Sequence, residues 1–260
     1  MIVNNPFLTQ APAAYAEAAV LAETVGTEML ARLQWMTLQP DRVVDVGCGV
    51  GSHLGLLQKH YPGATVLGVD VTYPMLQYAK AQDPLYKLCC ADVRALPFAN
   101  HSVDVIFANL LLPWCKDLEL VLREWRRVLK PNGLLMFSCL GPDTLLAWRE
   151  IFSEVMLVDL MDMHDYGDAL KRVGFVDPVM DVERVTLHYS QAEKMLDELV
   201  VSGFLLDQKG LLAHMAKPED KWVADFEVIY GHAWGGADAL TQTADEEGVV
   251  RFPLAYLRRK

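Results

Sequence analysis

The sequence predicts an α/β protein whose core is a doubly wound, seven-stranded, mostly parallel sheet. Short apolar runs alternate with helical patterns from residue 42 to residue 140, as expected of successive β-α units. Two more strand patterns follow late in the chain, and one of them should run antiparallel to the others. With 260 residues the chain is long enough to bury a full core in a single domain.

Hydrophobic periodicity gives the individual elements. Apolar residues recur at three- or four-residue steps over 13–38, which predicts one long N-terminal helix. The alternating segment should contain strands at 42–46, 64–70, 86–91, 103–109 and 133–140, and helices at 51–60, 73–82 and 117–129. The later part should contain helices at 144–156, 165–173 and 191–202 and strands at 176–188 and 222–234, while 204–221 has no clear pattern.

Turn-forming residues, helix-capping residues and composition divide the predicted single domain, 1–260, into four parts. Pro131–Gly133 should stop a helix and make a turn, and Asp143 or Thr144 should cap the next helix. The parts are an N-terminal helical lid at 1–40, a binding core at 41–140, a substrate and cap region with the last strands at 141–235, and a tail at 236–260.

A glycine-rich run at the end of the first predicted strand is the strongest sign of a binding site. The letters D-V-G-C-G-V-G at 45–51 place three glycines in a strand-to-helix turn, where the backbone can approach a ligand closely. Asp70 follows about 20 residues later at the end of the second strand, a spacing that suits a ribose diol. The order differs from the dinucleotide motif and no phosphate-binding lysine follows. A nucleoside-like ligand without phosphates is favoured, and S-adenosylmethionine (SAM) is the common one.

Further candidate contacts stand at the ends of the next strands, where ligands of open α/β sheets bind. Asp45 could hold loop amides or meet the ammonium group of SAM through a water molecule. Asp92 could accept the adenine amino group while the Val93 amide donates to a ring nitrogen, and Asn109 should lie near the sulfonium. The cofactor candidates are Asp45, Gly47, Gly49, Gly51, Asp70, Val71, Met75, Asp92, Val93 and Asn109.

Several of these residues could instead have a purely structural role. Asp70 could cap the next helix, Asp92 could cap a loop, and Met75 could be an ordinary core residue. The joint spacing of the glycine run and Asp70 favours the binding role for the set as a whole.

Composition excludes several other functions. The chain has 34 acidic and 23 basic residues, and its net charge of −11 argues against nucleic-acid binding. No apolar run is long enough for a membrane span, and the N-terminus lacks the pattern of a signal peptide. The five cysteines are scattered and include no C-x-x-C pair, so we expect reduced thiols, no metal site and a cytoplasmic location.

The four binding blocks together resemble class I SAM-dependent methyltransferases, with their Rossmann-like fold, over 42–140. The outer segments narrow the resemblance: an aromatic N-terminal stretch at 6–15, the letters G-P-D-T-L at 141–145, and E-V-I-Y-G-H-A-W-G at 227–235. Over about 6–235 the chain is similar to the malonyl-acyl-carrier-protein O-methyltransferase family of biotin synthesis.

The resemblance implies a reaction and its partners. Members use SAM, yielding S-adenosylhomocysteine, to esterify the free carboxyl of a malonyl group carried on the phosphopantetheine arm of an acyl carrier protein; malonyl-CoA is the other possible substrate. The substrate-side candidates are Tyr15 and Trp114, as lid and wall, and Arg149, as the carboxylate binder, with His164 and His188 as weaker alternatives. A basic face from Arg123 to Lys130, or Lys171 and Arg172, could meet the acidic carrier.

Some residues depart from the family pattern. Gln10 and Pro12 stand where a basic residue is usual, Pro113 replaces a usual glutamine, and 204–221 lacks the usual Gly-Ala-x-Asn and arginine-rich pattern. These changes keep open a SAM-binding module without turnover. Two further functions also stay open: another small-molecule or quinone-type methyltransferase, and a non-methylating relative that serves respiratory-complex assembly as a protein hydroxylase or chaperone.

Overall fold

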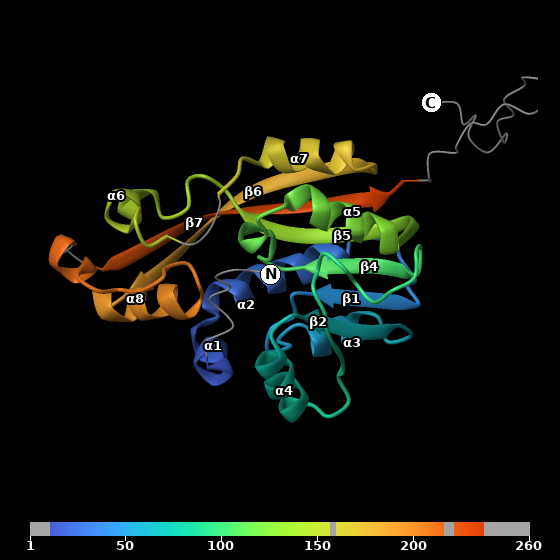
Figure 1. Ribbon diagram of the computed structural model, residues 1–260, viewed down its shortest axis with the longest axis horizontal. Helices are drawn as coiled ribbons and strands as arrows, with labels where there is room; N and C mark the ends of the chain where they lie inside the picture. The colour runs from blue at the N-terminus through green and yellow to red at the C-terminus, as the bar shows by residue number, and fades with distance from the viewer. Residues whose placement is uncertain (1–10, 157–159, 216–220, 237–260) are drawn as a thin grey trace, which may run out of the picture.

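A computed structural model describes residues 11–156, 160–215 and 221–236, and these form one layered α/β unit (Figure 1). Its central sheet has the strand order β3-β2-β1-β4-β5-β7-β6. The strands are β1 (Arg42–Val46), β2 (Thr65–Asp70), β3 (Lys87–Cys90), β4 (Val103–Ala108), β5 (Leu129–Leu140), β6 (Phe175–Tyr189) and β7 (Trp222–Gly235). Only β7 runs antiparallel to its neighbours in this sheet. The predicted fold class is confirmed, including the single antiparallel strand.

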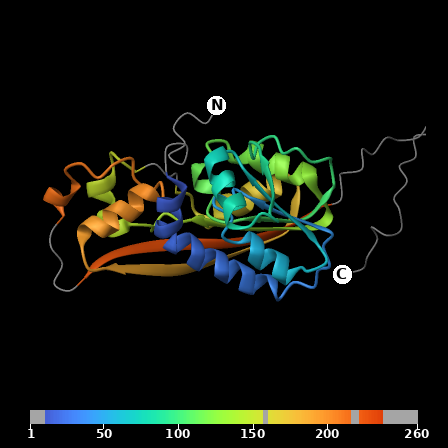
Figure 2. The same ribbon diagram turned by 90° about the horizontal axis from the view of Figure 1, so that it is seen from below.

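Helices cover both faces of the sheet and define two apolar cores (Figures 1 and 2). The helices are α1 (Pro12–Ala18), α2 (Val20–Leu33), α3 (Leu54–His60), α4 (Tyr73–Gln82), α5 (Leu118–Val128), α6 (Arg149–Phe152), α7 (Met163–Arg172) and α8 (Ala192–Val201). Buried side chains of α2, α3 and α8 belong to one core, and those of α5 and α7 to the other. Within the described ranges, no helix is long and apolar enough to cross a bilayer.

The antiparallel pair of β6 and β7 extends beyond the carboxyl ends of the parallel strands and carries a cap. Figure 1 shows α6 and α8 at this end of the strand pair, with α1 between α8 and α4. Short 3-10 turns complete the cap at Leu146–Trp148 (η3) and Leu211–His214 (η4), and an isolated bridge joins Met156 to Leu205. The predicted glycine turn therefore lies at the same edge of the sheet as the cap.

Two predicted helices are wrong in extent. The helix expected over 13–38 breaks at Ala19 and ends at Leu33. No proline or glycine marks the break; α1 packs between α4 and α8 while α2 packs on the sheet, so tertiary contacts decide it. The helix expected over 144–156 is only η3 followed by α6, because Leu145 adopts a left-handed backbone (φ +52°) that a regular helix excludes.

The residues expected to form a turn and a helix cap do interrupt regular structure, but in other ways than predicted. Pro131–Gly133 forms a bulge inside β5, with Asn132 at φ +62°, rather than a separate turn. Asp143 and Thr144 do not cap a helix; the Thr144 hydroxyl instead exchanges hydrogen bonds with the Glu227 backbone. The unassigned segment contains η4, and its residues 216–220 lie outside the described part of the chain.

Candidate functional site

The glycine turn joins β1 to α3 at the carboxyl edge of the sheet. The Gly47 and Cys48 amides both donate to the Val69 carbonyl, at 2.7 and 3.1 Å, which holds the turn against β2. Gly47, Gly49 and Gly51 have φ values of +77°, +51° and +81°, in the left-handed region that favours glycine. The turn therefore needs the glycines that the motif supplies.

Asp70 ends β2 directly beside this turn. Its carboxylate accepts the Gly49 amide at 2.9 Å on one oxygen and the Thr72 amide at 2.7 Å on the other. Burial raises the pKa of Asp70, and the amide hydrogen bonds oppose that shift. Each carboxylate oxygen has a further lone pair. Asp70 therefore shapes the turn, and its carboxylate stands at the strand end where a ribose diol is expected to bind.

Asp45, at the start of the turn, is the most unusual side chain of the site. It is 2% exposed, and its Oδ2 atom is buried without a hydrogen-bond partner. Burial, together with the negative charge of Asp70, raises the pKa of Asp45 to about 8. A buried carboxylate without a partner is costly for the fold, which is typical of a group that awaits a ligand.

Tyr15 of α1 covers the turn from the other side. A Cβ atom placed on Gly49 would lie 3.7 Å from the Tyr15 ring, which is ordinary contact. Burial and the charges of Asp70 and Asp45 raise the pKa of Tyr15 to about 12. The phenol and the two carboxylates thus lie close together beside the glycine backbone, and such a group of oxygens suits the ammonium group of SAM.

The expected adenine contacts follow β3, and here the structure adds a competitor. Asp92 is paired with Arg94, whose Nη2 lies 2.5 Å from Oδ2 and whose Nε lies 2.9 Å from Oδ1. The hydrogen bonds from Arg94 lower the pKa of Asp92. Met75 and Val93 are buried, and Val71 is half-buried after Asp70. An adenine amino group would have to share the Asp92 carboxylate with Arg94.

Asn109 follows β4 and has both ends of its amide engaged. Its Nδ2 donates to the Ala22 carbonyl at 2.7 Å, and its Oδ1 accepts from the Ser138 hydroxyl at 2.8 Å. The same hydroxyl accepts the Leu110 amide at 2.9 Å. Asn109 thus lies at the expected edge of the sheet, and it ties β4 to β5 and to α2.

The substrate-side candidates lie where the sheet meets the cap. Trp114 donates from Nε1 to the Gly203 carbonyl at 3.3 Å, and its ring centroid is 5.6 Å from that of Phe204. Arg149, at the start of α6, donates to the Pro142 carbonyl after β5. His164 and His188 are exposed, and His164 contacts Asp162 at 2.5 Å. The structure therefore brings Trp114 and Arg149 to the cap and leaves both histidines on the surface.

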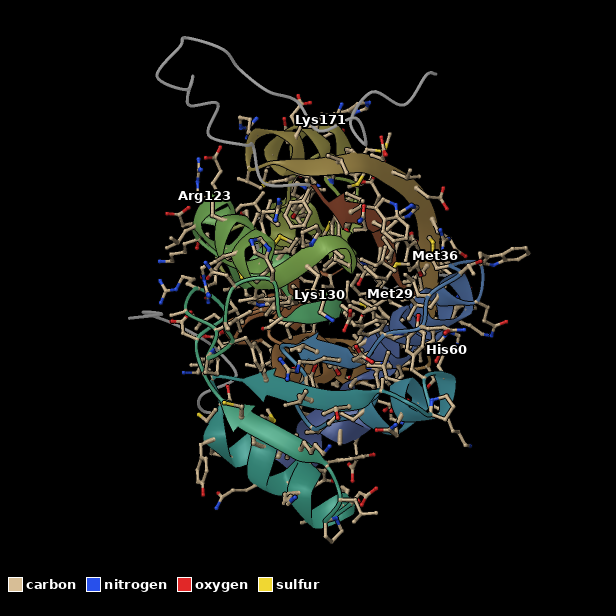
Figure 3. All side chains as sticks on the ribbon, turned by 90° about the vertical axis from the view of Figure 1, so that its right-hand side faces the viewer. Met29, Met36, His60, Arg123, Lys130 and Lys171 are labelled. Carbon is tan, nitrogen blue, oxygen red and sulfur yellow. The ribbon has the colours of Figure 1, made fainter. Side chains whose placement is uncertain are left out.

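The basic face expected to meet the carrier lies at the opposite edge of the sheet. Lys130 pairs with Asp104 at 2.7 Å and with Asp41 at 3.7 Å, residues that stand at or just before the amino ends of β4 and β1. Figure 3 labels Lys130 with Arg123 and Lys171 in the view onto this end. Arg127 pairs with Glu124 at 2.6 Å, and Arg126 donates to the Gly174 and Gly236 carbonyls. Most of its cations are thus paired within the chain, and the expectation that this face, or Lys171 and Arg172, meets the carrier stays a prediction.

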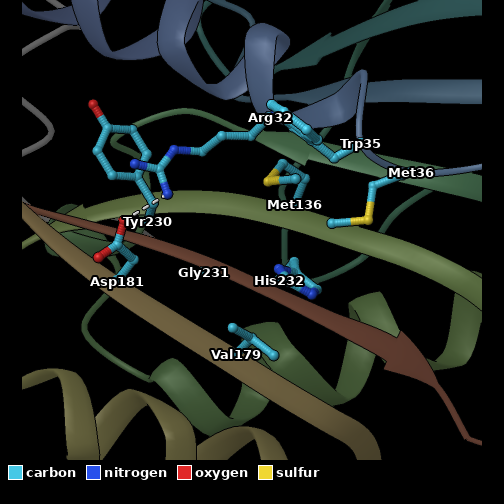
Figure 4. Close-up of a pocket in the computed structure, with 9 residues that line it drawn as sticks. All are labelled: Arg32, Trp35, Met36, Met136, Val179, Asp181, Tyr230, Gly231 and His232. Atoms are coloured by element: carbon cyan, nitrogen blue, oxygen red, sulfur yellow. Dashed lines mark hydrogen bonds and ion pairs between the residues drawn. The ribbon is translucent and has the colours of Figure 1, made fainter.

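A separate hollow lies under the end of α2, against β5, β6 and β7 (Figure 4). Arg32 dominates it: the guanidinium bonds Asp181 at 2.8 Å and Glu28 at 3.0 Å and stacks 4.1 Å from the centre of the Tyr230 ring. These contacts pair the two charged groups that line the hollow, Arg32 and Asp181, and hold Arg32 to Glu28 within α2. We interpret it as the anchor of α2 and place the functional site at the glycine turn.

Some residues of the site region carried no signal in the sequence. Phe204 packs between Trp114 and Phe226, with ring centroids 5.6 and 5.4 Å apart, but it stands in the segment without a pattern. Ser138 and Glu227 sit within strand patterns as ordinary polar positions. Glu227 belongs to the segment 227–235 that carries the family resemblance. The sequence therefore pointed to this segment, but not to the contacts that Glu227 makes across the sheet.

Known proteins with similar sequences are methyltransferases. A family model described as a methyltransferase domain matches residues 44–137. The chain is 36% identical over 270 residues to the malonyl-acyl-carrier-protein O-methyltransferase of Halorhodospira halophila, covering 95% of this chain and 91% of the relative. It is 39% identical over 262 residues to the protein of that name from Gallionella capsiferriformans, covering 90% of each.

Solved structures share the fold at lower identity. A putative methyltransferase from Bacillus halodurans superposes with a TM-score of 0.60 at 17% identity, covering 80% of this chain and 99% of that one. A Haemonchus contortus phosphoethanolamine N-methyltransferase, solved with S-adenosylhomocysteine, gives a TM-score of 0.57 at 21% identity, covering 81% of this chain and 53% of that one. These likenesses establish the fold as that of SAM-dependent methyltransferases.

Proposed function

Because the chain belongs to the malonyl-acyl-carrier-protein O-methyltransferase family, we propose that it esterifies the free carboxylate of a malonyl group on an acyl carrier protein. The single structural observation that carries the proposal is Asp45, a buried carboxylate without a partner on Oδ2 beside the glycine turn. This observation supports a ligand that brings an ammonium group. SAM has one.

The residues that would hold SAM surround the turn. The glycines and Asp45 would face its amino-acid part, Asp70 its ribose, and Asp92, Val93 and Met75 its adenine. Val71 and Asn109 border these positions. When bound, SAM supplies an electrophilic methyl group and leaves as S-adenosylhomocysteine.

The chain's own task is then mainly positioning. A malonyl carboxylate is already ionised at neutral pH, so the reaction requires no general base. Arg149 would orient that carboxylate, because a guanidinium binds a carboxylate through two parallel hydrogen bonds. Tyr15 would act as the lid and Trp114 as the wall that keep water out. Orientation and exclusion of water are effective for such a transfer.

The product places the reaction in early biotin synthesis, at the pimeloyl stage. A methyl ester hides the charge of the malonyl end, so that enzymes of fatty-acid synthesis would accept the chain as a primer. The reaction must therefore precede a class of chain-elongating condensations and be followed by an ester hydrolysis.

The deciding experiment supplies the purified protein with methyl-labelled SAM and malonyl-acyl-carrier protein, with malonyl-CoA in a parallel arm. We expect a base-labile labelled methyl ester, and the faster arm identifies the preferred carrier. Absence of label in both arms, with SAM bound normally, would refute the proposal.

A binding experiment tests the cofactor site by itself. We expect Asp70→Ala to weaken SAM binding at least tenfold, because it removes the ribose acceptor and the support of the Gly49 amide. Asp41→Ala, which removes an exposed carboxylate at the opposite edge of the sheet, is the matched control and should bind normally. Calorimetric titration measures both constants, and equal affinities would remove the ribose assignment.

A further inference from the structure

One peptide group after β5 is held on both sides by charged side chains. The Asp143 N–H donates to Glu227 Oε2 at 2.6 Å. The Pro142 carbonyl, which belongs to the same peptide group, accepts from Arg149. The peptide is trans, so its N–H and C=O point in opposite directions. Glu227 and Arg149 are therefore connected as a pair of opposite charges with one peptide group between them.

The turn that contains this peptide is built around Glu227. The Gly141 amide donates to the Glu227 carbonyl at 2.8 Å, and the buried Thr144 hydroxyl exchanges hydrogen bonds of 3.3 and 3.2 Å with the Glu227 backbone. A Cβ atom placed on Gly141 would lie 2.4 Å from Glu227 Cδ. A glycine at 141 thus makes room for the carboxylate, and the turn at 141–144 and Glu227 fit one another.

The turn also lies at the edge of the sheet that holds the candidate site. It follows β5, whose neighbour β4 leads into Asn109 and Trp114, and Ser138 near the end of β5 bonds Asn109 directly. A side chain held by this turn is therefore within the same group of strand ends as the glycine turn. Arg149 is the cation that the turn holds there.

We propose that Glu227 is a positioning residue that acts through the Pro142–Asp143 peptide on Arg149, and so orients the cation that receives the substrate's free carboxylate. This rests on the proposed function. A carboxylate on the N–H side polarises the peptide, which strengthens the hydrogen bond that its carbonyl accepts. The guanidinium has five N–H donors, so the bond to Pro142 leaves others for a carboxylate. Glu227 itself would repel an anionic substrate, so its effect must pass through the peptide.

A double-mutant cycle in the full chain tests the relay. In Glu227→Ala we expect the KM for malonyl-acyl-carrier protein to rise roughly 10- to 100-fold, the range for a lost hydrogen bond to a charged group. The Kd for SAM should stay within about twofold. In an Arg149→Ala background, Glu227→Ala should add nothing further, because its effect requires Arg149. Glu227→Gln keeps an acceptor oxygen and should recover part of the loss.

Glu150→Ala is the control, since Glu150 is an exposed carboxylate next to Arg149 on α6. Additive effects of Glu227→Ala and Arg149→Ala on KM would overturn the relay. So would a loss of SAM affinity in Glu227→Ala by the same factor as the rise in KM. If the unaltered chain methylates no malonyl substrate, the proposed function fails separately. Hydrogen exchange at the Asp143 amide then decides: we expect it faster in both single variants, and no change in Arg149→Ala would overturn the relay.

Discussion

Burial separates Asp45 from the other carboxylates that the structure describes, because its charged form lacks both water and a full set of hydrogen-bond partners. Its ordinary pKa is 3.8, and in the folded protein burial and Asp70 raise this to about 8. Between these two values the folded chain holds a proton that the unfolded chain has released. The contribution of Asp45 to stability is therefore full below pH 4 and is lost as the pH rises toward 8.

Replacing Asp45 with Asn should remove this cost. We expect Asp45→Asn to raise the free energy of unfolding of the SAM-free protein by roughly 1–3 kcal/mol at pH 8 and by little at pH 4. The same variant should bind SAM weakly, since the partner of the ammonium is gone. Urea unfolding at a series of pH values measures the first effect and calorimetry the second. Parallel pH curves for the two proteins would show that Asp45 is not the titrating group.

At the scale of elements, the glycine turn combines two separate demands on the backbone. A Cβ atom on Gly47 would lie 2.9 Å from the Leu111 side chain, whereas one on Gly49 would meet only ordinary contact with Tyr15. Both glycines have positive φ, which costs any other residue about 1 kcal/mol or more. Gly47 therefore carries a steric demand in addition to the conformational one.

This difference predicts an order of stability among three variants. Gly47→Ala should destabilise the fold most, because the new Cβ atom must displace Leu111. Gly49→Ala should be destabilised only by the cost of a positive φ at a residue other than glycine. Gly63→Ala, where nothing lies within 4 Å, should be close to neutral. Thermal unfolding of the three variants at one pH gives the order. A Gly49→Ala variant less stable than Gly47→Ala would contradict it.

The N-terminal helices differ in how firmly they are held. Helix α2 buries six residues, and Arg32 and the Asn109 bond to Ala22 anchor it, whereas α1 buries none. A hydrogen bond from the Ser202 hydroxyl to the Ala18 carbonyl joins α1 to the end of α8. If α1 is the lid, the moving part of the described residues 11–40 is α1, with its hinge at Ala19.

Hydrogen exchange tests this division of the lid. The amides of α1 should exchange much faster than those of α2 in the SAM-free protein, since local opening requires few buried contacts to break. On addition of SAM we expect α1 to slow, because Tyr15 would then close over the bound ligand, while α2 should change little. Equal slowing of both helices would mean that the whole region moves as one body.

Local patterns predicted most elements and failed where distant contacts decide. The strands up to β5 and the glycine turn follow from periodicity and from glycine chemistry, both properties of neighbouring residues. The break at Ala19 and the left-handed Leu145 have no local signal, because each depends on packing against parts of the chain far away in sequence. The structure of segment 204–221 could not be predicted for the same reason, because Phe204 is buried by residues 114 and 226.

On the scale of the whole molecule, three distant segments close the site. Tyr15 comes from the N-terminus, Trp114 from the loop after β4, and Phe204 from the cap, while the turn after β5 is fixed by β7. The sequence predicts the cofactor half from residues that follow consecutive strands at known spacings. It predicts the substrate half only by resemblance, because the contacts there join residues about 90 positions apart, as Trp114 and Gly203 are.

The junction of cap and core at Phe204 gives the last prediction. Phe204 is 3% exposed and packs against Trp114 and Phe226, so its removal leaves a cavity between the two parts. We expect Phe204→Ala to lower the free energy of unfolding by about 3–5 kcal/mol, the usual cost for a buried phenylalanine. Leu206→Ala, two residues away but 62% exposed, should change it by less than about 0.5 kcal/mol.

Because none of the cofactor candidates takes part in this contact, Phe204→Ala should keep its SAM affinity at a temperature where it is folded, and its methyl transfer should fall. Urea unfolding with SAM titration measures both quantities, and a variant that loses SAM binding and methyl transfer in proportion would mean that cap and core act as one unit.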